Sequence, residues 1–103
     1  MNAEVIAGRQ ISGTGGSVDF MRAAKVSRGG RSIIAMTATA KGDSVSRIVP
    51  KVEMVTALRT DVDLVGTEYG VADLRHATRQ KRREALIDIA HPDFQTTLRD
   101  AIA

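Results

Sequence analysis

The sequence predicts an α/β fold, an open sheet of short strands with flanking helices. Short apolar segments separated by turn residues occupy the first two thirds of the chain, which is typical of strands. The last third shows helical periodicity instead, and one further helical segment lies between the first two predicted strands. With 103 residues and 43% hydrophobic content, this order of elements favours one small layered domain.

The N-terminal part of the chain is expected to form a strand, a glycine-rich loop and a helix. Residues 4–11 have the apolar character of a strand that enters the loop. Ser17 suits an N-cap, because its hydroxyl can accept a hydrogen bond from the first helical turn, so a helix is predicted over residues 18–26. Gly29 and Gly30 end the helical pattern.

Four more strands are predicted in the middle of the chain. The run Ile33-Ile34-Ala35-Met36 indicates a buried strand over residues 31–36. The others are expected at residues 45–49, where Pro50 ends the strand, and at residues 52–56 and 62–65. A turn is expected at Lys41-Gly42-Asp43 and a loop at Thr67-Glu68-Tyr69-Gly70.

Two helices are predicted at the C-terminal end. Residues 79–90 place apolar side chains near one face, and Pro92 suits the first position of a second helix. In that helix Phe94, Leu98 and Ile102 recur at four-residue spacing. The chain begins within a predicted strand and offers its short strands few partners, so we expect it to be a piece of a larger enzyme.

The glycine-rich loop is the first candidate site. Three glycines, at positions 13, 15 and 16, lead directly into the predicted helix. Glycine allows tight turns and close approach to its N–H group, and a helix start presents unpaired N–H donors with a partial positive charge. This combination suits an anion, or an oxygen that becomes negatively charged during a reaction.

Composition excludes several classes of protein. The chain has no cysteine, so it has neither disulfides nor a thiolate site, and it is expected to be cytoplasmic. No apolar run is long enough to span a membrane. The net charge is +3, but the basic run at residues 79–83 fits a solvated helix face better than a nucleic-acid site. His76 and His91 lack a third ligand at a credible spacing, so no metal is expected.

Six segments together carry a family resemblance, and they are Ala7-Gly8-Arg9-Gln10-Ile11-Ser12-Gly13, Gly15-Gly16-Ser17-Val18-Asp19-Phe20, Ser46-Arg47-Ile48-Val49-Pro50, Arg59-Thr60-Asp61-Val62, Thr67-Glu68-Tyr69-Gly70-Val71-Ala72-Asp73-Leu74-Arg75 and Ala90-His91-Pro92-Asp93-Phe94. In this order and spacing they closely resemble the C-terminal end of the acetyl-CoA hydrolase/transferase family, which includes 4-hydroxybutyrate, butyrate and succinyl-CoA:acetate CoA-transferases. The resemblance implies that residues 1–103 are the C-terminal portion of the family's C-terminal domain, which is of the CoA-transferase type.

The resemblance also implies a reaction. The nucleophile of the family is a glutamate upstream of this chain, which attacks an acyl-CoA to form an acyl-glutamyl anhydride and then a glutamyl-CoA thioester. The expected substrates are an acyl-CoA and a short carboxylic acid, with coenzyme A as co-substrate and no metal. The expected partners are the upstream portion of the enzyme and further copies of it in a homo-oligomer, with no nucleic acid and no membrane.

Five residues match site positions of the family. Gly16 matches a glycine whose N–H lines the oxyanion hole, and Glu68 matches a second active-site acid. Lys41 matches a lysine that contacts CoA, while Ser12 and Gly15 lie on the loop near the CoA thiol. Three of them also have a plainer explanation: Gly16 as a helix-entry turn, Lys41 as a surface lysine and Glu68 as an exposed loop residue.

Three positions depart from the family pattern. Asp43 and His76 stand where relatives commonly carry glycine, and Gly66 replaces a bulkier strand residue.

An alternative function is a non-catalytic module that binds CoA or a nucleotide phosphate through the glycine loop. Binding of nucleic acid through residues 79–83 is a third and weaker hypothesis.

Overall fold

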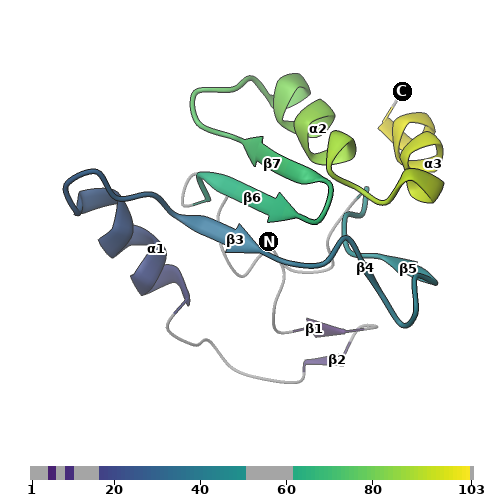
Figure 1. Ribbon diagram of the computed structural model, residues 1–103, viewed down its shortest axis with the longest axis horizontal. Coiled ribbons are helices and arrows are strands. Elements are labelled where there is room, and N and C mark those ends of the chain that lie inside the picture. The colour runs from purple at the N-terminus through teal and green to yellow at the C-terminus, as the bar shows by residue number, and fades with distance from the viewer. Residues whose placement is uncertain (1–4, 7–8, 11–16, 51–61, 103) are drawn as a thin grey trace.

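A computed structural model of the chain describes residues 5–6, 9–10, 17–50 and 62–102. Its centre is a three-stranded sheet in the order β3-β6-β7, formed by β3 (Ile33–Ala35), β6 (Leu64–Thr67) and β7 (Gly70–Asp73). β3 runs parallel to β6, and β7 runs antiparallel to β6 (Figure 1). The described part of the chain is therefore α/β, as the sequence predicts.

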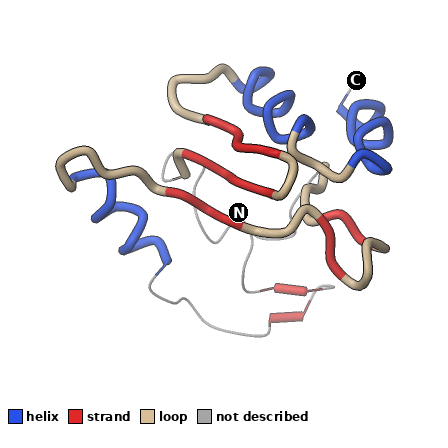
Figure 2. The backbone as a smooth tube through the Cα atoms, viewed as in Figure 1, coloured by secondary structure: helices blue, strands red, loops and turns tan. Residues whose placement is uncertain are grey.

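Three helices flank this sheet. Helix α1 (Ser17–Val26) precedes β3, and α2 (Arg79–Asp88) and α3 (Pro92–Ile102) follow β7 (Figure 2). All three lie within a few residues of the predicted ranges. Gly29 and Gly30 follow the end of α1, and the φ of Gly29 is +71°, a conformation that glycine adopts at little cost. No helix in the described ranges is long and apolar enough to cross a membrane.

The β6–β7 pair is a hairpin that the sequence did not reveal. Thr67 and Gly70 form its last pair, so Glu68 and Tyr69 are the two turn residues. We expected a strand at residues 62–65 and a simple loop after it. The strand begins and ends two residues later, and the loop is the turn into β7. Antiparallel pairing across the turn supplies the hydrogen bonds that extend β6.

Two small antiparallel pairs complete the described strands. β4 (Thr39–Ala40) pairs with β5 (Val45–Ser46), and the expected turn at Lys41-Gly42-Asp43 joins them. β5 is shorter than predicted. β1 (Val5–Ile6) pairs with β2 (Arg9–Gln10), so the prediction of one strand over residues 4–11 is wrong. Val5 pairs with Gln10 and Ile6 pairs with Arg9, so the two short strands run in opposite directions. The strand predicted at residues 52–56 lies outside the described residues.

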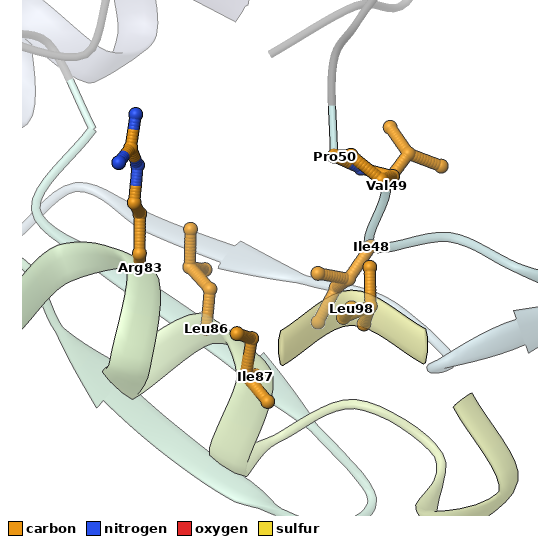
Figure 3. A pocket seen from close by; sticks show the side chains of 7 residues that line it. All are labelled: Ile48, Val49, Pro50, Arg83, Leu86, Ile87 and Leu98. Atoms are coloured by element: carbon orange, nitrogen blue, oxygen red, sulfur yellow. The ribbon is translucent and has the colours of Figure 1, made fainter. Parts of the chain in front are cut away.

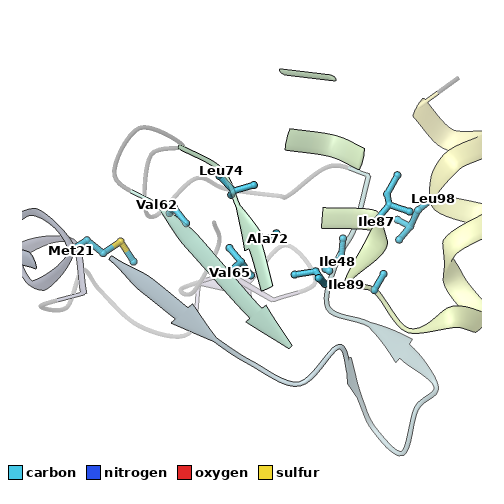
Figure 4. Packing of buried hydrophobic residues seen from close by; sticks show 10 residues of the cluster. Met21, Ile48, Val62, Val65, Ala72, Leu74, Ile87, Ile89 and Leu98 are labelled. Atoms are coloured by element: carbon cyan, nitrogen blue, oxygen red, sulfur yellow. The ribbon is translucent and has the colours of Figure 1, made fainter. Parts of the chain in front are cut away.

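The hydrophobic core lies between one face of the sheet and the C-terminal helices. Val65, Ala72, Ile87, Ile89 and Leu98 are buried there (Figure 4). The opposite face of the sheet is open: Ile33 is 61% exposed and Val71 is 68% exposed. The prediction that residues 31–36 form a buried strand is therefore correct for only one face. The described helices cover a single side of the sheet.

Candidate functional site at the carboxyl edge of the sheet

Glu68 lies at the carboxyl ends of two parallel strands. It directly follows β6, and its Oε1 accepts a hydrogen bond of 2.7 Å from the backbone N–H of Ala38, just beyond the end of β3. Ala38 is fully buried, whereas Glu68 is exposed. Ligands of open α/β sheets bind at this edge, where strand ends and the loops that follow them converge. The structure thus places the predicted Glu68 where a carboxylate can reach a bound molecule.

The segment that holds Glu68 is itself well fixed. The N–H of Arg47 donates to the carbonyl of Ala38 at 2.8 Å. The Arg47 Nε group donates to Thr37 Oγ1 at 3.1 Å and to the carbonyl of Thr39 at 3.2 Å. Arg47 belongs to a segment that carries the resemblance, yet the sequence suggested no role for it. The donor to Glu68 is a backbone group, so no side-chain pattern could have revealed it.

Lys41 lies at the start of the turn between β4 and β5 and is exposed. Its φ is +52°, and those of Gly42 and Asp43 are +63° and +66°, so three consecutive residues adopt the left-handed conformation. The Asp43 carboxylate accepts a hydrogen bond from the Thr39 hydroxyl. Short polar side chains such as that of Asp43 tolerate this conformation better than most others.

The turn after β7 contains another residue with a left-handed backbone. His76 has a φ of +56°, a conformation that glycine adopts more easily than other residues. Just before it, Arg75 forms a two-pronged ion pair with Asp73, with N–O distances of 2.9 and 2.7 Å. The hydrogen bonds from the Arg75 side chain and backbone lower the pKa of Asp73 to about 2.

Tyr69 and His91 make a contact that the sequence did not suggest. The Tyr69 ring meets the His91 ring edge-on, with centroids 5.6 Å apart and planes at 79°. From the sequence, Tyr69 is expected to be a packing residue and His91, which precedes Pro92, a residue of the helix junction. The structure places His91 at the junction of α2 and α3 and shows that Tyr69 packs against it.

Two hollows lie away from Glu68. One, of about 70 Å³, is apolar and is lined by Ile48, Val49, Pro50, Arg83, Leu86, Ile87 and Leu98 (Figure 3). The other, of about 290 Å³, is lined by Lys25, Val62, Asp63, Leu74, Arg75, His76 and Arg82. It contains the ion pair of Lys25 with Asp63, at 3.2 Å. Neither hollow includes a predicted site residue.

The glycine loop falls outside the described residues. Ser12, Gly15 and Gly16 are therefore predictions that the structure does not test. Of the five predicted site residues, the structure places Glu68 and Lys41. The basic run at the start of α2 is mostly exposed, although Arg82 is half-buried and donates to the carbonyl of Leu74 at 2.8 Å.

Curated relatives share most of this sequence. The chain is 50% identical over 99 residues to a 4-hydroxybutyrate coenzyme A transferase from Clostridium kluyveri, an alignment that covers 93% of the chain and 23% of the relative. It is 37% identical over 100 residues to an acetyl-CoA hydrolase from Kluyveromyces lactis, covering 96% of the chain and 19% of the relative. The chain thus spans about a quarter or less of the length of these relatives.

Solved structures share the fold. RipA from Yersinia pestis matches 97% of the chain with a TM-score of 0.90 and 42% identity, over 23% of its own length. A 4-hydroxybutyrate CoA-transferase from Porphyromonas gingivalis matches 84% of the chain with a TM-score of 0.77 and 54% identity, over 22% of its length. The family model for the acetyl-CoA hydrolase/transferase C-terminal domain matches residues 1–102. This match over almost the whole chain, together with the sequence identities, shows that the chain belongs to the acetyl-CoA hydrolase/transferase family of enzymes.

Proposed function

We propose that this chain forms one wall of the active site of a CoA-transferase or acyl-CoA hydrolase that acts on a short-chain acyl-CoA and a carboxylic acid. Family membership supports the class of reaction. The observation that carries the role of this chain is the position of Glu68. Its exposed carboxylate is anchored through one oxygen to the N–H of Ala38, at the edge of the sheet where α/β proteins bind ligands.

The proposed reaction is covalent, with the nucleophilic glutamate in the part of the enzyme outside this chain. Its carboxylate attacks the thioester carbon, and the C–S bond breaks. CoA departs as a thiolate, and the acyl group remains on the enzyme as an acyl-glutamyl anhydride. The thiolate then attacks the glutamyl carbonyl, which releases the donor acid and forms a glutamyl-CoA thioester. An acceptor carboxylate then attacks the glutamyl-CoA thioester, and both steps run in reverse to give a new acyl-CoA. Attack by water on the same thioester instead releases free CoA.

This chain contributes groups that bind and orient. The N–H of Gly16 donates to the oxygen that becomes negative in each tetrahedral intermediate. Ser12 and Gly15 contact the thiol end of CoA, and the Lys41 ammonium provides a positive charge for its phosphates or amides. Glu68 orients the acceptor acid or the nucleophilic glutamate. The exposure of Lys41 and Glu68 is consistent with contacts to groups beyond this chain.

A hybrid enzyme tests the role of Glu68. In the hybrid, residues 1–102 replace the matching segment of the Clostridium kluyveri transferase. We expect the 103-residue chain alone to show no turnover, because it lacks the nucleophile, and the hybrid to transfer CoA. Glu68→Gln in the hybrid is expected to lower kcat by about tenfold to a hundredfold. The control is Glu84→Gln, which changes an exposed glutamate on α2. Equal kcat values for the two variants would contradict the role of Glu68.

The same hybrid distinguishes the alternative function. A module that only binds CoA or a nucleotide phosphate would be stabilised by these ligands, yet it would support neither transfer nor hydrolysis. Detection of CoA binding without turnover in the hybrid therefore favours the non-catalytic module.

A further inference from the structure

We propose that Tyr69 and His91 are positioning residues that hold the hairpin tip so that the Glu68 carboxylate keeps its orientation. The inference rests on the proposed function of Glu68. It follows from the contacts between the β6–β7 turn and the junction of α2 with α3, here called the helix corner and defined by Ile89, Ala90, His91 and Phe94.

The two turn residues make contacts with different parts of the molecule. Glu68 reaches back to the segment after β3, where it accepts the hydrogen bond from Ala38. Its neighbour Tyr69 lies against the helix corner, with its ring 5.6 Å from that of His91. A shift of the turn that breaks one contact therefore displaces the other, because the two residues share a peptide bond.

The His91 ring forms a rigid support. Its side chain is only 17% exposed, and its other neighbour is Phe94, at a centroid distance of 6.0 Å and an interplanar angle of 72°. Its Nδ1 accepts a hydrogen bond of 3.1 Å from the backbone N–H of Asp93 in the first turn of α3. Edge-to-face ring contacts and a fixed ring nitrogen leave His91 one orientation in which Tyr69 can pack.

Hydrogen bonds between the Thr67 side chain and two backbone groups reinforce the ring contact. The Thr67 hydroxyl donates to the carbonyl of Ile89 at 2.6 Å and accepts from the N–H of Tyr69 at 3.1 Å. A Cβ at Gly70 would lie 3.6 Å from Ile89 Cγ2, which shows that the hairpin end packs closely on the corner. Thr67, Tyr69 and Gly70 therefore fix the backbone on both sides of Glu68.

The contact of Tyr69 with the helix corner affects the orientation of Glu68 more than the stability of the fold. Tyr69 is 45% exposed, so its ring buries little apolar surface and contributes modestly to folding. A glutamate side chain, however, has several rotatable bonds, and fixing it in one conformation costs rotamer entropy. Anchoring its backbone confines that cost to the side chain, and preorganised groups act more effectively on a transition state.

Kinetics of the hybrid enzyme test the inference. We expect Tyr69→Leu and His91→Asn each to lower kcat by about fivefold to twentyfold, with KM for the acyl-CoA within about twofold. Asn keeps an acceptor for the Asp93 N–H but removes the ring, and Tyr69→Phe keeps the ring contact and should restore most of the activity. When Glu68→Gln is already present, Tyr69→Leu should have almost no further effect on kcat.

The outcomes separate the two proposals. An unchanged kcat in Glu68→Gln overturns the role of Glu68 and, with it, the positioning role. A reduced kcat in Glu68→Gln, combined with an undiminished further loss from Tyr69→Leu, overturns the positioning role alone.

A measurement on the 103-residue chain gives a readout independent of activity. Amide hydrogen exchange at Ala38 should be faster in Tyr69→Leu than in the parent chain, at equal global stability. Val71→Thr is the control, since it changes the same hairpin on its exposed side. Equal protection of Ala38 in Tyr69→Leu and the parent chain would overturn the inference.

Discussion

Gly66 is a strand residue with room for a side chain. A Cβ built on it would lie 4.0 Å from its nearest neighbours, the carbonyl oxygen of Gly70 and Cγ2 of Val71. Glycine within a strand costs about 0.5–1 kcal/mol relative to alanine, because it loses more backbone freedom on folding. We therefore expect Gly66→Ala to raise the free energy of unfolding by about that amount, measured by chemical denaturation of the chain.

Gly30 provides the matched control. A Cβ there would lie 2.0 Å from the carbonyl oxygen of Ala24, a backbone atom that cannot move aside without distorting the end of α1. Gly30→Ala is expected to lower the free energy of unfolding by about 1–3 kcal/mol. A stabilising Gly30→Ala, or a destabilising Gly66→Ala, would contradict this description of the two sites.

The Asp73–Arg75 pair gives the fold a dependence on acid pH. The pKa of Asp73 is about 2 in the folded chain, against an ordinary value of 3.8, because Arg75 donates hydrogen bonds to the carboxylate. A lowered folded pKa contributes stability that is complete above pH 3.8 and is lost as the pH falls toward 2.

We expect Asp73→Asn to remove this contribution. The difference in free energy of unfolding between the parent chain and Asp73→Asn should shrink as the pH falls from 5 to 2, in a denaturation series at fixed salt. Asp88→Asn is the control, since its ion pair with Arg99 is longer, at 3.5 Å, and exposed. A difference that stays constant over this pH range would contradict the pairing.

The stability of the first turn of helix α2 depends on its N-cap, Thr78. Thr78 Oγ1 accepts a hydrogen bond of 3.2 Å from the N–H of Lys81, and the first turn holds basic residues and no acidic one. Positive charge at a helix start opposes the macrodipole, so the cap is the favourable local term at this end.

Thr78→Ala is expected to lower the free energy of unfolding by about 1 kcal/mol. Thr78→Asp should retain or exceed the parent stability, because aspartate also caps and adds a negative charge at the positive end of the helix dipole. Thermal unfolding of the three chains checks both expectations. Equal stability of Thr78→Ala and the parent chain would show that the cap contributes little.

Elements were predictable where their signals are local. Helix ends are marked locally by Gly29, Gly30 and Pro92 through their own backbone chemistry, and the three helices lie where expected. β7 was missed because Gly70-Val71-Ala72-Asp73 carries almost no apolar pattern, and its pairing with β6 is what makes it a strand.

In the part of the chain that the structure describes, one face of the sheet carries exposed apolar side chains. Strand pairing places Ile33, Leu64 and Val71 on that face, together with Ala35 and Gly66. Contiguous exposed apolar surface is typical of interaction sites. Most of the polypeptide of the relatives lies outside the matched region, and we expect part of it to cover this face in the longer enzyme.

A dye that binds apolar surface tests how open this face is in the isolated chain. We expect Ile33→Thr combined with Val71→Thr to lower dye binding, with a change in free energy of unfolding of only about 0.5 kcal/mol, because both residues are exposed. Ile34→Thr changes a half-buried neighbour packed against the core and should destabilise the chain instead. Unchanged dye binding in the double variant would contradict an open apolar face.

The choice of Glu68 and Lys41 as site residues came from the sequence and stays a prediction. The α/β class, the three helices, the turn at residues 41–43 and the family could all be predicted from the amino-acid sequence alone. These depend on short-range chemistry or on motifs. The tertiary structure decided which groups meet. Ala38 and Glu68 are 30 residues apart, and Thr67 and Ile89 are 22 apart. Contacts between residues so far apart in the sequence form only when strand pairing and helix packing bring the segments together, so no local sequence pattern predicts them.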